Sequence, residues 1–386
     1  MSTDFAAADV TASPGRERRR RAIQGAVFLA ALALIAWLSP MPDRVTDRGV
    51  YEATAAQGIV SDCTDLHCFR VLVAWTLGVI PGPSVLKWKA YAVVANTAAA
   101  LAVFELCLAF GLNRRVAWLA SLASGFGFGS LYTLHDSYTS DPLMFALGPV
   151  MTIELLKDRV AVSGAIGAIG VLAKEFAAAP LIIFATAAAL ERRWSVAGRV
   201  LVAANFVCIV WAIFQLTLIV RFNYGYGGNT SPHLLTGAGL GPWLAQQSLT
   251  GALSAMFNEY GALYLLMPVG FLFAPGPLRR LTIAAVPPAI IFCYLQQPDR
   301  ALWNFHFLLV PLAAIVLDRA PAALAWGTLT TFVFANLRVG AQLRAVPAAR
   351  FALAASVLLA AASIVYGLRG GALRAQSPNA DHLALT

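Results

Sequence analysis

Long apolar runs alternate with short polar stretches along the chain. About 20 apolar residues are needed for a helix to cross a bilayer. We therefore expect crossings at residues 22–38, 86–111, 116–132, 142–156, 200–220, 259–274, 281–296, 303–317, 321–337 and 351–368. The apolar stretch from 160 to 190 is interrupted midway, and we interpret it as a hairpin of two short helices. The pattern predicts an all-α membrane protein, a polytopic bundle of about 10–12 transmembrane helices.

The polar ends of the chain set the expected domain boundaries. Residues 1–21 form a basic N-terminal tail, residues 22–368 a single transmembrane domain, and residues 369–386 a C-terminal tail, with both tails in the cytoplasm. The first apolar run lacks a clear small-residue cleavage site, so we interpret it as an uncleaved helix. Residues 71–80 are too few to span, and we expect them to lie along the interface in the first outer loop.

Composition narrows the class of protein. Apolar residues make up 59% of the 386 positions and charged residues only 12%, a balance that a water-soluble globule of this size does not show. The net charge of +9 comes from short basic clusters between apolar runs. Such clusters are typical of topology signals rather than of a nucleic-acid surface, and they favour a cytoplasmic N-terminus in a bacterial inner membrane.

Ionisable residues embedded in apolar sequence are the candidates for function, because each costs a few kcal/mol at membrane depth on the lenient scale. Under the expected topology they gather at the outer face. They are Asp43, Asp47 and Glu52 in the first loop, Asp136 and Asp141 in the second, Lys174 and Glu175 in the hairpin, and Asp299 and Arg300 in a later loop. A carboxylate can take a proton from an acceptor hydroxyl, and Lys and Arg can hold a leaving phosphate. This set therefore suits group transfer from a membrane-bound phosphate substrate.

Several short motifs occur in one order along residues 22–318. They are Asp47-x-x-x-Tyr51, Phe69-Arg70-Val71-Leu72, Ser140-Asp141-Pro142-Leu143, the run Gly170 to Glu175, and Pro298-Asp299-Arg300. In their order, and in their common location on the outer side of the membrane, these motifs resemble the pattern of the GT-C superfamily. This superfamily of integral-membrane glycosyltransferases includes protein mannosyltransferases and aminoarabinose transferases. Members take a sugar from a polyprenyl-phosphate carrier.

The resemblance implies an inverting transfer at the periplasmic face, from a polyprenyl-phosphate-linked sugar donor to a lipid, glycan or protein acceptor. Asp47 would be the general base, with Asp43 as the second candidate. Lys174 and Arg300 would lie near the carrier phosphate. The other residues that would bind substrate are Tyr51, Asp136, Asp141 and Glu175. Many members have adjacent acids in the first loop, whereas here Asp43 and Asp47 are four residues apart.

Structural roles compete with these functional ones. The first-loop acids could pair with Arg44 and Arg48 in solvent, and Asp141 could start a helix with Pro142 at its first turn. Lys174 and Glu175 could form structural ion pairs, but adjacent residues on a helix do not face each other, so each needs its own partner.

Arg300 could be only an interfacial anchor. His135 beside Asp136 could hold a divalent metal or belong to a satisfied turn. No cofactor is indicated by any stronger motif.

Cys63 and Cys68 enclose four residues of the first outer loop, where an oxidising compartment permits a disulfide. A metal site that uses His67 with both thiolates is the alternative. A disulfide here would stiffen the loop that carries the acids.

Two other classes of function stay open. A secondary transporter or flippase places polar residues near the midplane on broken helices, and Lys174 in an interrupted run favours it. We find no internal repeat, and the acids lie at helix ends, which both favour the transferase. A non-catalytic subunit of an envelope complex, in contact with membrane lipids, is the third interpretation.

Overall fold

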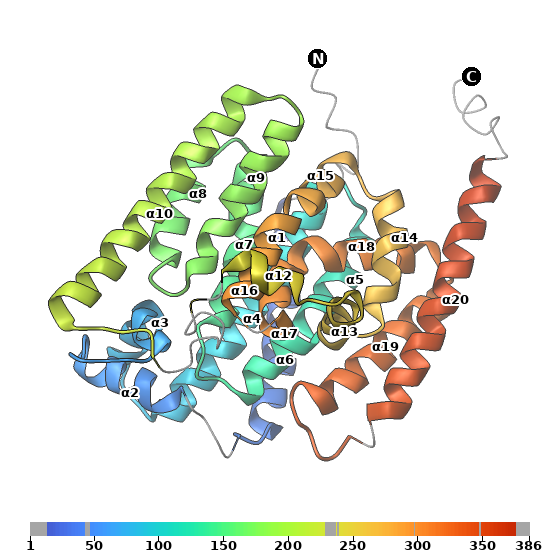
Figure 1. Ribbon diagram of the computed structural model, residues 1–386. Helices are drawn as coiled ribbons and strands as arrows, with labels where there is room; N and C mark the ends of the chain where they lie inside the picture. The colour runs from blue at the N-terminus through green and yellow to red at the C-terminus, as the bar shows by residue number, and fades with distance from the viewer. Residues whose placement is uncertain are drawn as a thin grey trace.

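The computed structural model describes residues 14–42, 47–227, 237, 239–296, 298–346 and 349–375, and every regular element in these ranges is helical (Figure 1). The first half contains α1 (Pro14–Leu38), α2 (Arg48–Gln57), the 3-10 helix η1 (Leu66–Phe69), α3 (Val71–Gly78), α4 (Ser84–Ala109), α5 (Arg114–Gly125), α6 (Phe128–His135), α7 (Asp141–Leu156), α8 (Val160–Gly170), η2 (Glu175–Ala178), α9 (Ala179–Leu190) and α10 (Trp194–Phe222). The second half contains α12 (Leu240–Ala245), α13 (Leu249–Tyr260), α14 (Leu263–Phe273), α15 (Gly276–Ala284), α16 (Val286–Leu295), α17 (Pro298–Leu302), η3 (Trp303–Phe305), α18 (His306–Arg319), α19 (Ala322–Val339) and α20 (Ala349–Ala375). The predicted all-α class is confirmed.

Within the described ranges, five segments are long and apolar enough to cross a membrane. They are Arg18–Leu38, Ser84–Ala109, Trp194–Phe222, Gly276–Leu295 and Ala349–Arg369. The other apolar helices are shorter, so several of the expected crossings are built from helix pieces. The protein is a multi-pass membrane protein, and the total of 10–12 crossings stays a prediction.

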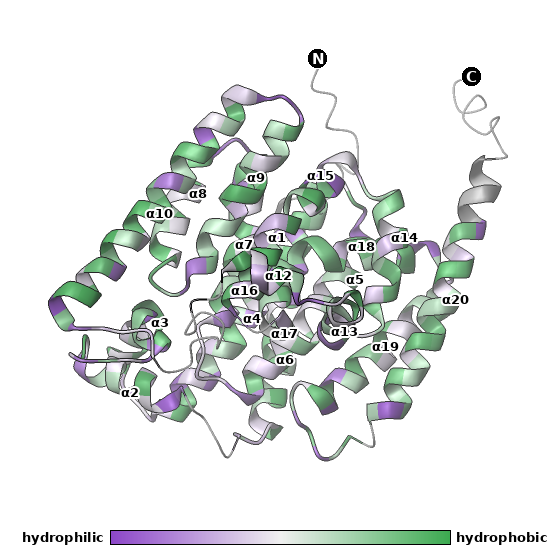
Figure 2. Ribbon diagram, in the orientation of Figure 1, coloured by the Kyte–Doolittle hydropathy of each residue, from purple (hydrophilic) through white to green (hydrophobic). Residues whose placement is uncertain are grey.

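The long helices divide into a central one and peripheral ones. Two thirds of the apolar window of α4 is buried inside the protein, whereas about a fifth of the windows of α10 and α20 is buried. These two helices flank the bundle on opposite sides and are predominantly hydrophobic (Figures 1 and 2). Large apolar side chains on α10, such as Phe206 and Ile213, are exposed on the protein surface. Such a surface is stable only against lipid or another protein.

The crossing that we expected over 116–132 is not one continuous helix, because the structure has α5 and α6 with a break at residues 126–127. The reason is the close approach of Trp303. A Cβ atom added to Gly127 would come within 2.0 Å of the Trp303 ring, and one added to Gly129 within 2.3 Å. The chain therefore bends around an aromatic ring that lies far away in sequence.

The hairpin expected between residues 160 and 190 is confirmed. Helices α8 and α9 are its two legs, and Lys174 lies between them in extended backbone, with φ −168° and ψ 141°. The first loop packs on this turn, because the backbone N–H of Leu72 donates to the carbonyl oxygen of Leu172 at 3.0 Å. Two regions a hundred residues apart in sequence thus meet at the hairpin turn.

The first loop folds into the short helices α2, η1 and α3, which lie together near the Phe222 end of α10 (Figure 1). We call this part of the molecule the α2–α3 end. The predicted short helix over 71–80 is α3, and its residues Val71, Val73, Ala74 and Leu77 are buried. The far end of the bundle carries the turn between α9 and α10.

Candidate functional site

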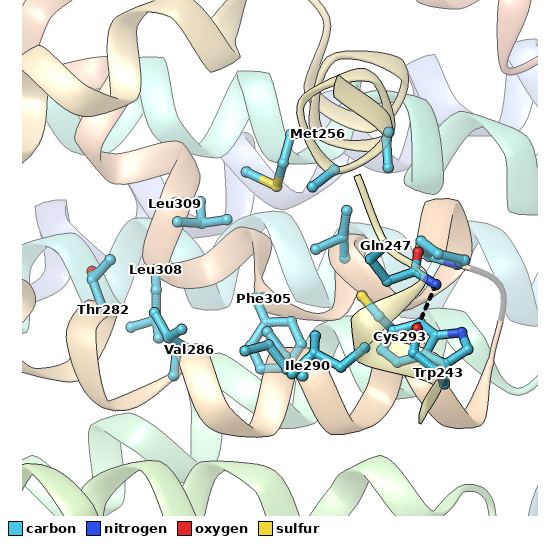
Figure 3. Close-up of a pocket in the computed structure, with 18 residues that line it drawn as sticks. Trp243, Gln247, Met256, Thr282, Val286, Ile290, Cys293, Phe305, Leu308 and Leu309 are labelled. Atoms are coloured by element: carbon cyan, nitrogen blue, oxygen red, sulfur yellow. Dashed lines mark hydrogen bonds between the residues drawn. The ribbon is translucent and has the colours of Figure 1, made fainter. Parts of the chain in front are cut away.

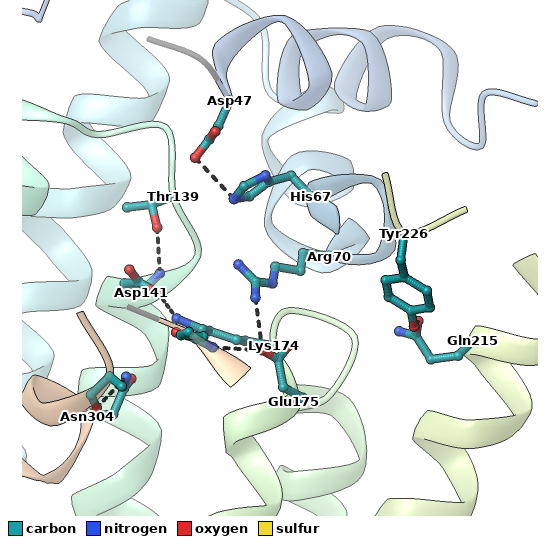
Figure 4. Close-up of polar contacts among 12 residues, drawn as sticks. Asp47, His67, Arg70, Thr139, Asp141, Lys174, Glu175, Gln215, Tyr226 and Asn304 are labelled. Atoms are coloured by element: carbon teal, nitrogen blue, oxygen red, sulfur yellow. Dashed lines mark hydrogen bonds and ion pairs between the residues drawn. The ribbon is translucent and has the colours of Figure 1, made fainter. Parts of the chain in front are cut away.

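Asp47 immediately precedes α2 and is the first acid of the site (Figure 4). Its side chain is 9% exposed, and its Oδ2 lies 3.1 Å from Nε2 of His67. The buried carboxylate is thus directed at a second titratable group rather than at solvent. The structure therefore places Asp47 inside the protein, away from the solvated loop that was the alternative.

His67 lies between two carboxylates. Its Nδ1 is 2.8 Å from Oδ1 of Asp65, and the same oxygen accepts the backbone N–H of His67 at 2.8 Å. Asp65 is the N-cap of η1, so the turn that carries His67 is fixed by its own first residue. Asp47, His67 and Asp65 form a continuous chain of polar contacts.

Arg70 follows η1 and reaches across to the hairpin. Its Nη2 donates to Oε1 of Glu175 at 2.9 Å, and Nε2 of Gln296 donates to the same oxygen at 2.8 Å. Burial lowers the pKa of Arg70, but the Glu175 carboxylate outweighs it and raises the pKa above its ordinary value. Arg70 is therefore a fixed positive charge that joins the first loop, the hairpin and the end of α16.

Lys174 and Asp141 form a second buried ion pair beside the first. Nζ of Lys174 donates to Oδ1 of Asp141, and the two side chains are 2% and 10% exposed. Asp141 is the first residue of α7, and its backbone N–H donates to Oγ1 of Thr139 at 3.2 Å. Lys174 and Glu175 thus have separate partners, as the sequence required.

Tyr51 is fully buried between these charges. Its ring lies 5.6 Å from that of His67 and 5.0 Å from that of Trp88, measured between centroids. Burial raises the pKa of its hydroxyl well above the ordinary value, so the phenol stays protonated at neutral pH. Tyr51 can act as a donor and as a rigid wall of the site.

A more exposed polar group borders the cluster. Oε1 of Glu52 accepts hydrogen bonds from the Tyr138 hydroxyl at 2.8 Å and from Nε of Arg48 at 3.0 Å, and Ser84 contacts the same hydroxyl at 3.0 Å. Burial raises the pKa of Glu52, but these donors outweigh it and lower the pKa below its usual range. This group links α2 to α4 and to the segment before α7.

Three further residues were predicted for the site: Asp43, Arg300 and Asp136. Asp43 is outside the described residues. Arg300 belongs to α17, the helix that follows Gln296 along the chain, but its side chain is not among the described residues. Asp136 directly follows α6, half-buried, and its backbone N–H donates to the carbonyl oxygen of Tyr132 at 2.8 Å. The cluster therefore consists of Asp47, Tyr51, Asp141, Lys174 and Glu175, with Arg70, His67 and Asp65 added.

Those last three residues were not predicted as site residues. Arg70 was part of a motif, and His67 was considered only as a metal ligand. A signal was present, because both follow Cys63 within one short polar segment that leads into an apolar run. In the structure Cys63 and Cys68 form a disulfide, so the metal alternative with both thiolates is wrong. Among the described residues, no group of three or more His, Cys, Asp or Glu side chains is arranged to hold a metal ion.

An apolar cavity of about 330 Å³ runs beside α16, as Figure 3 shows. Its walls come from α12, α13, α15, α16, α17, η3 and α18, and they include Met256, Ile290, Cys293, Phe305 and Leu309. Along α16 the cavity reaches Cys293, and the helix ends at Leu295, directly before the Gln296 that contacts Glu175. The cavity and the ion pairs are therefore joined by the end of α16.

No protein-family model matches the sequence, and no curated protein matches it either. A solved structure does match in three dimensions, that of ArnT from Cupriavidus metallidurans in the apo state. The TM-score is 0.53 at 13% sequence identity, over 90% of this chain and 77% of that chain. The likeness covers most of the chain, which therefore shares its membrane fold with that structure of ArnT.

Proposed function

We propose that the protein is a membrane glycosyltransferase that transfers a sugar from a polyprenyl-phosphate carrier to a lipid, glycan or protein acceptor. The reaction takes place at the α2–α3 end, which is the periplasmic face of a bacterial inner membrane. One observation carries the proposal: a buried acid, Asp47, belongs to the same compact cluster as two buried cations, Arg70 and Lys174. The ArnT-like fold supports it.

The charges suit a phosphate ester. Arg70 and Lys174 are 9% and 2% exposed at their side chains, and each is balanced by one carboxylate. Cations that are already held in place by hydrogen bonds need little reorganisation to stabilise a leaving phosphate. Binding of an anion between them requires Glu175 or Asp141 to yield part of its contact. Charge exchange of this kind favours an anionic substrate over a neutral one.

The apolar cavity suits the carrier's isoprenoid chain. A chain that enters along α16 places its phosphate near Gln296 and the Glu175–Arg70 pair. Arg300 on α17 lies at the same end of the cavity, since Pro298 and Leu302 of this helix line it. The polar head and the apolar tail of one substrate thus have adjacent sites.

In the reaction, Asp47 removes the proton of the acceptor hydroxyl while the oxygen attacks C1 of the sugar. The bond between C1 and the phosphate oxygen breaks, and its electron pair leaves with the phosphate. Arg70 and Lys174 stabilise the negative charge on the departing polyprenyl phosphate. Attack opposite to the leaving group inverts the configuration at C1.

The test uses purified protein in lipid nanodiscs with a panel of undecaprenyl-phosphate-linked hexoses, pentoses and aminosugars, and a membrane extract as acceptor source. Release of free undecaprenyl phosphate, measured by mass spectrometry, reports transfer whatever the sugar and acceptor are. We expect release with the wild type and at least a hundredfold loss with Asp47→Asn.

Asp158→Asn is the matched control, because it makes the same change in an exposed acid at the far end of the bundle. It should leave release unchanged. Equal release from the two variants contradicts the assignment of Asp47. No release from the wild type with any donor, together with unchanged envelope glycolipids and glycoproteins in cells that carry Asp47→Asn, contradicts the transferase itself.

The broken α8–α9 hairpin with Lys174 at its turn also favours one alternative, a transporter or flippase for a lipid-linked or anionic substrate. The same nanodisc material distinguishes the two. A transporter moves a fluorescent polyprenyl-phosphate probe across a proteoliposome bilayer without release of undecaprenyl phosphate, whereas the transferase releases it from donor supplied on one side.

A further inference from the structure

His67 occupies an unusual position in the site, because both nitrogens of its ring are used by carboxylates. Nε2 contacts Asp47 at 3.1 Å and Nδ1 contacts Asp65 at 2.8 Å. The side chain is 9% exposed. A ring held in this way has no nitrogen left to take a proton directly from a substrate.

The hydrogen-bond chemistry fixes what the ring does. A neutral imidazole has one N–H donor and one acceptor lone pair, whereas the charged ring has two donors. Ionised carboxylates only accept. Both contacts are therefore attractive at the same time when both ring nitrogens carry hydrogen. In that state Nε2–H donates to Oδ2 of Asp47 and Nδ1–H donates to Oδ1 of Asp65, so the ring links the two carboxylates.

The turn that carries His67 is held by several contacts. The disulfide between Cys63 and Cys68 closes the turn, and the chain after α10 is hydrogen-bonded along it, with the N–H of Gly225 donating to the carbonyl of Cys63 at 2.9 Å. The ring of Phe69 stacks on that of Tyr226 with centroids 4.6 Å apart. A ring on a flexible loop could not hold a carboxylate in one orientation, but a ring on this turn can.

We propose that His67 is a positioning residue for Asp47: held by Asp65, it donates to Oδ2 and orients the carboxylate as a base. Tyr51, which packs edge-on against the ring, and Arg70 at the end of the same turn complete its surroundings. The proposal rests on the proposed transferase function for its purpose. The chemical reactivity of the Asp47 carboxyl group, however, can be measured without any substrate.

The substrate-free test is labelling with dicyclohexylcarbodiimide near pH 7 in nanodiscs. The reagent adds to protonated buried carboxyl groups and leaves a stable N-acylurea, which peptide mass spectrometry locates at Asp47. His67→Leu and His67→Gln are similar in size, and only glutamine can donate a hydrogen bond. We expect little adduct in the wild type, at least fivefold more in His67→Leu, and a level within twofold of the wild type in His67→Gln.

Activity supplies the second readout. With an accepted donor, His67→Leu should lower kcat at least tenfold and leave the donor KM within threefold, because carrier binding uses Arg70 and Lys174. His67→Gln should recover a large part of kcat. A role in packing alone predicts no recovery by glutamine, since it fits the site no better than leucine does.

The outcomes separate the two proposals. The same adduct level in wild type, His67→Leu and His67→Gln overturns the positioning role, even if the protein transfers sugar. The expected labelling pattern in a protein that releases no undecaprenyl phosphate overturns the transferase and leaves the positioning role standing. If His67→Leu does not fold, judged by its thermal unfolding, His67→Ala takes its place under the same expectations.

Discussion

The two ends of the molecule use ion pairs in different ways. At the far end, Arg199 and Asp158 are paired at 3.0 Å, and their side chains are 55% and 63% exposed. At the α2–α3 end, Lys174 and Asp141 are 2% and 10% exposed. An exposed pair contributes about 0–1 kcal/mol, because water screens it and long side chains lose entropy. Breaking a buried pair costs about 3–5 kcal/mol, because a charge is left in a poorly solvated place.

The difference indicates which charged side chains contribute little to the stability of the fold. Exposed arginines at the far end fit the basic loops that orient a membrane protein. Buried pairs are weak evidence for stability, since apolar residues of similar volume often serve as well. Two such pairs beside one buried acid point instead to chemistry. Four predictions test this contrast between the ends.

The largest effect is expected for Lys174→Met. It keeps most of the apolar stem but leaves the buried Asp141 carboxylate without the ammonium group, so we expect a loss of about 3–5 kcal/mol in the free energy of unfolding. Arg199→Met, the equivalent change at the far end, should cost less than about 1 kcal/mol. Thermal unfolding in detergent compares the two. Equal losses contradict the distinction between the ends.

Gly127→Ala should have the next largest effect. The new Cβ would come within 2.0 Å of the Trp303 ring, and overpacking of this kind costs about 1–3 kcal/mol. Gly198→Ala is the control on α10, because nothing lies within 4 Å of its added Cβ. Alanine is a better helix former than glycine, so this control should gain about 0.5–1 kcal/mol. Opposite signs in the melting temperatures are the expected result.

Removal of the disulfide should loosen the α2–α3 end. The double substitution Cys63→Ser with Cys68→Ser should lower the free energy of unfolding by about 2 kcal/mol, because the unfolded chain loses a constraint. Turnover should fall as well, since the turn carries His67 and Arg70. Cys208→Ser, at a free and exposed thiol on α10, is the control. A double variant with full stability and turnover would show that the packing of Phe69 on Tyr226 holds the turn without the disulfide.

The smallest effect concerns pH. The pKa of Glu52 is lowered in the folded protein, so the unfolded chain binds the proton more readily and stability is lost as pH falls through the folded pKa. Glu52 and Arg48 are 34% and 43% exposed, which limits the contribution to less than about 1 kcal/mol. Melting temperatures between pH 3 and 7 should fall less steeply for Glu52→Gln than for the wild type.

Particular residues show how far sequence reasoning reached. Lys174 was expected at a turn between two short helices, because the apolar run of about 30 residues has to return to the basic cluster at Arg192 and Arg193. Asp47 was chosen among the first-loop acids by its spacing to Tyr51. The structure buries both residues of that motif, and the catalytic role of Asp47 stays a prediction. The break within the crossing over 116–132 was missed, since hydropathy does not reveal a glycine pressed against a distant indole.

His67 and Arg70 show the reason for what was missed. Each is polar and flanked by cysteine or apolar residues, which predicts only a turn that leads into a short helix. Their partners, Asp47 and Glu175, lie 20 and 105 residues away, and those separations are set by how the first loop docks on the hairpin. Sequence periodicity carries no information about such docking.

The sequence by itself determined the solvent in which this chain folds, the helical class and the rare polar positions, because each of these depends on local hydrophobicity and on the cost of charge in lipid. Only the tertiary structure decided which carboxylate contacts which histidine, lysine or arginine. Ion-pair partners are chosen by the packing of α2, η1, the α8–α9 hairpin and α16 around one point, and those contacts join residues that are distant in sequence. The chain of contacts from Asp65 through His67 to Asp47 is therefore a product of the fold.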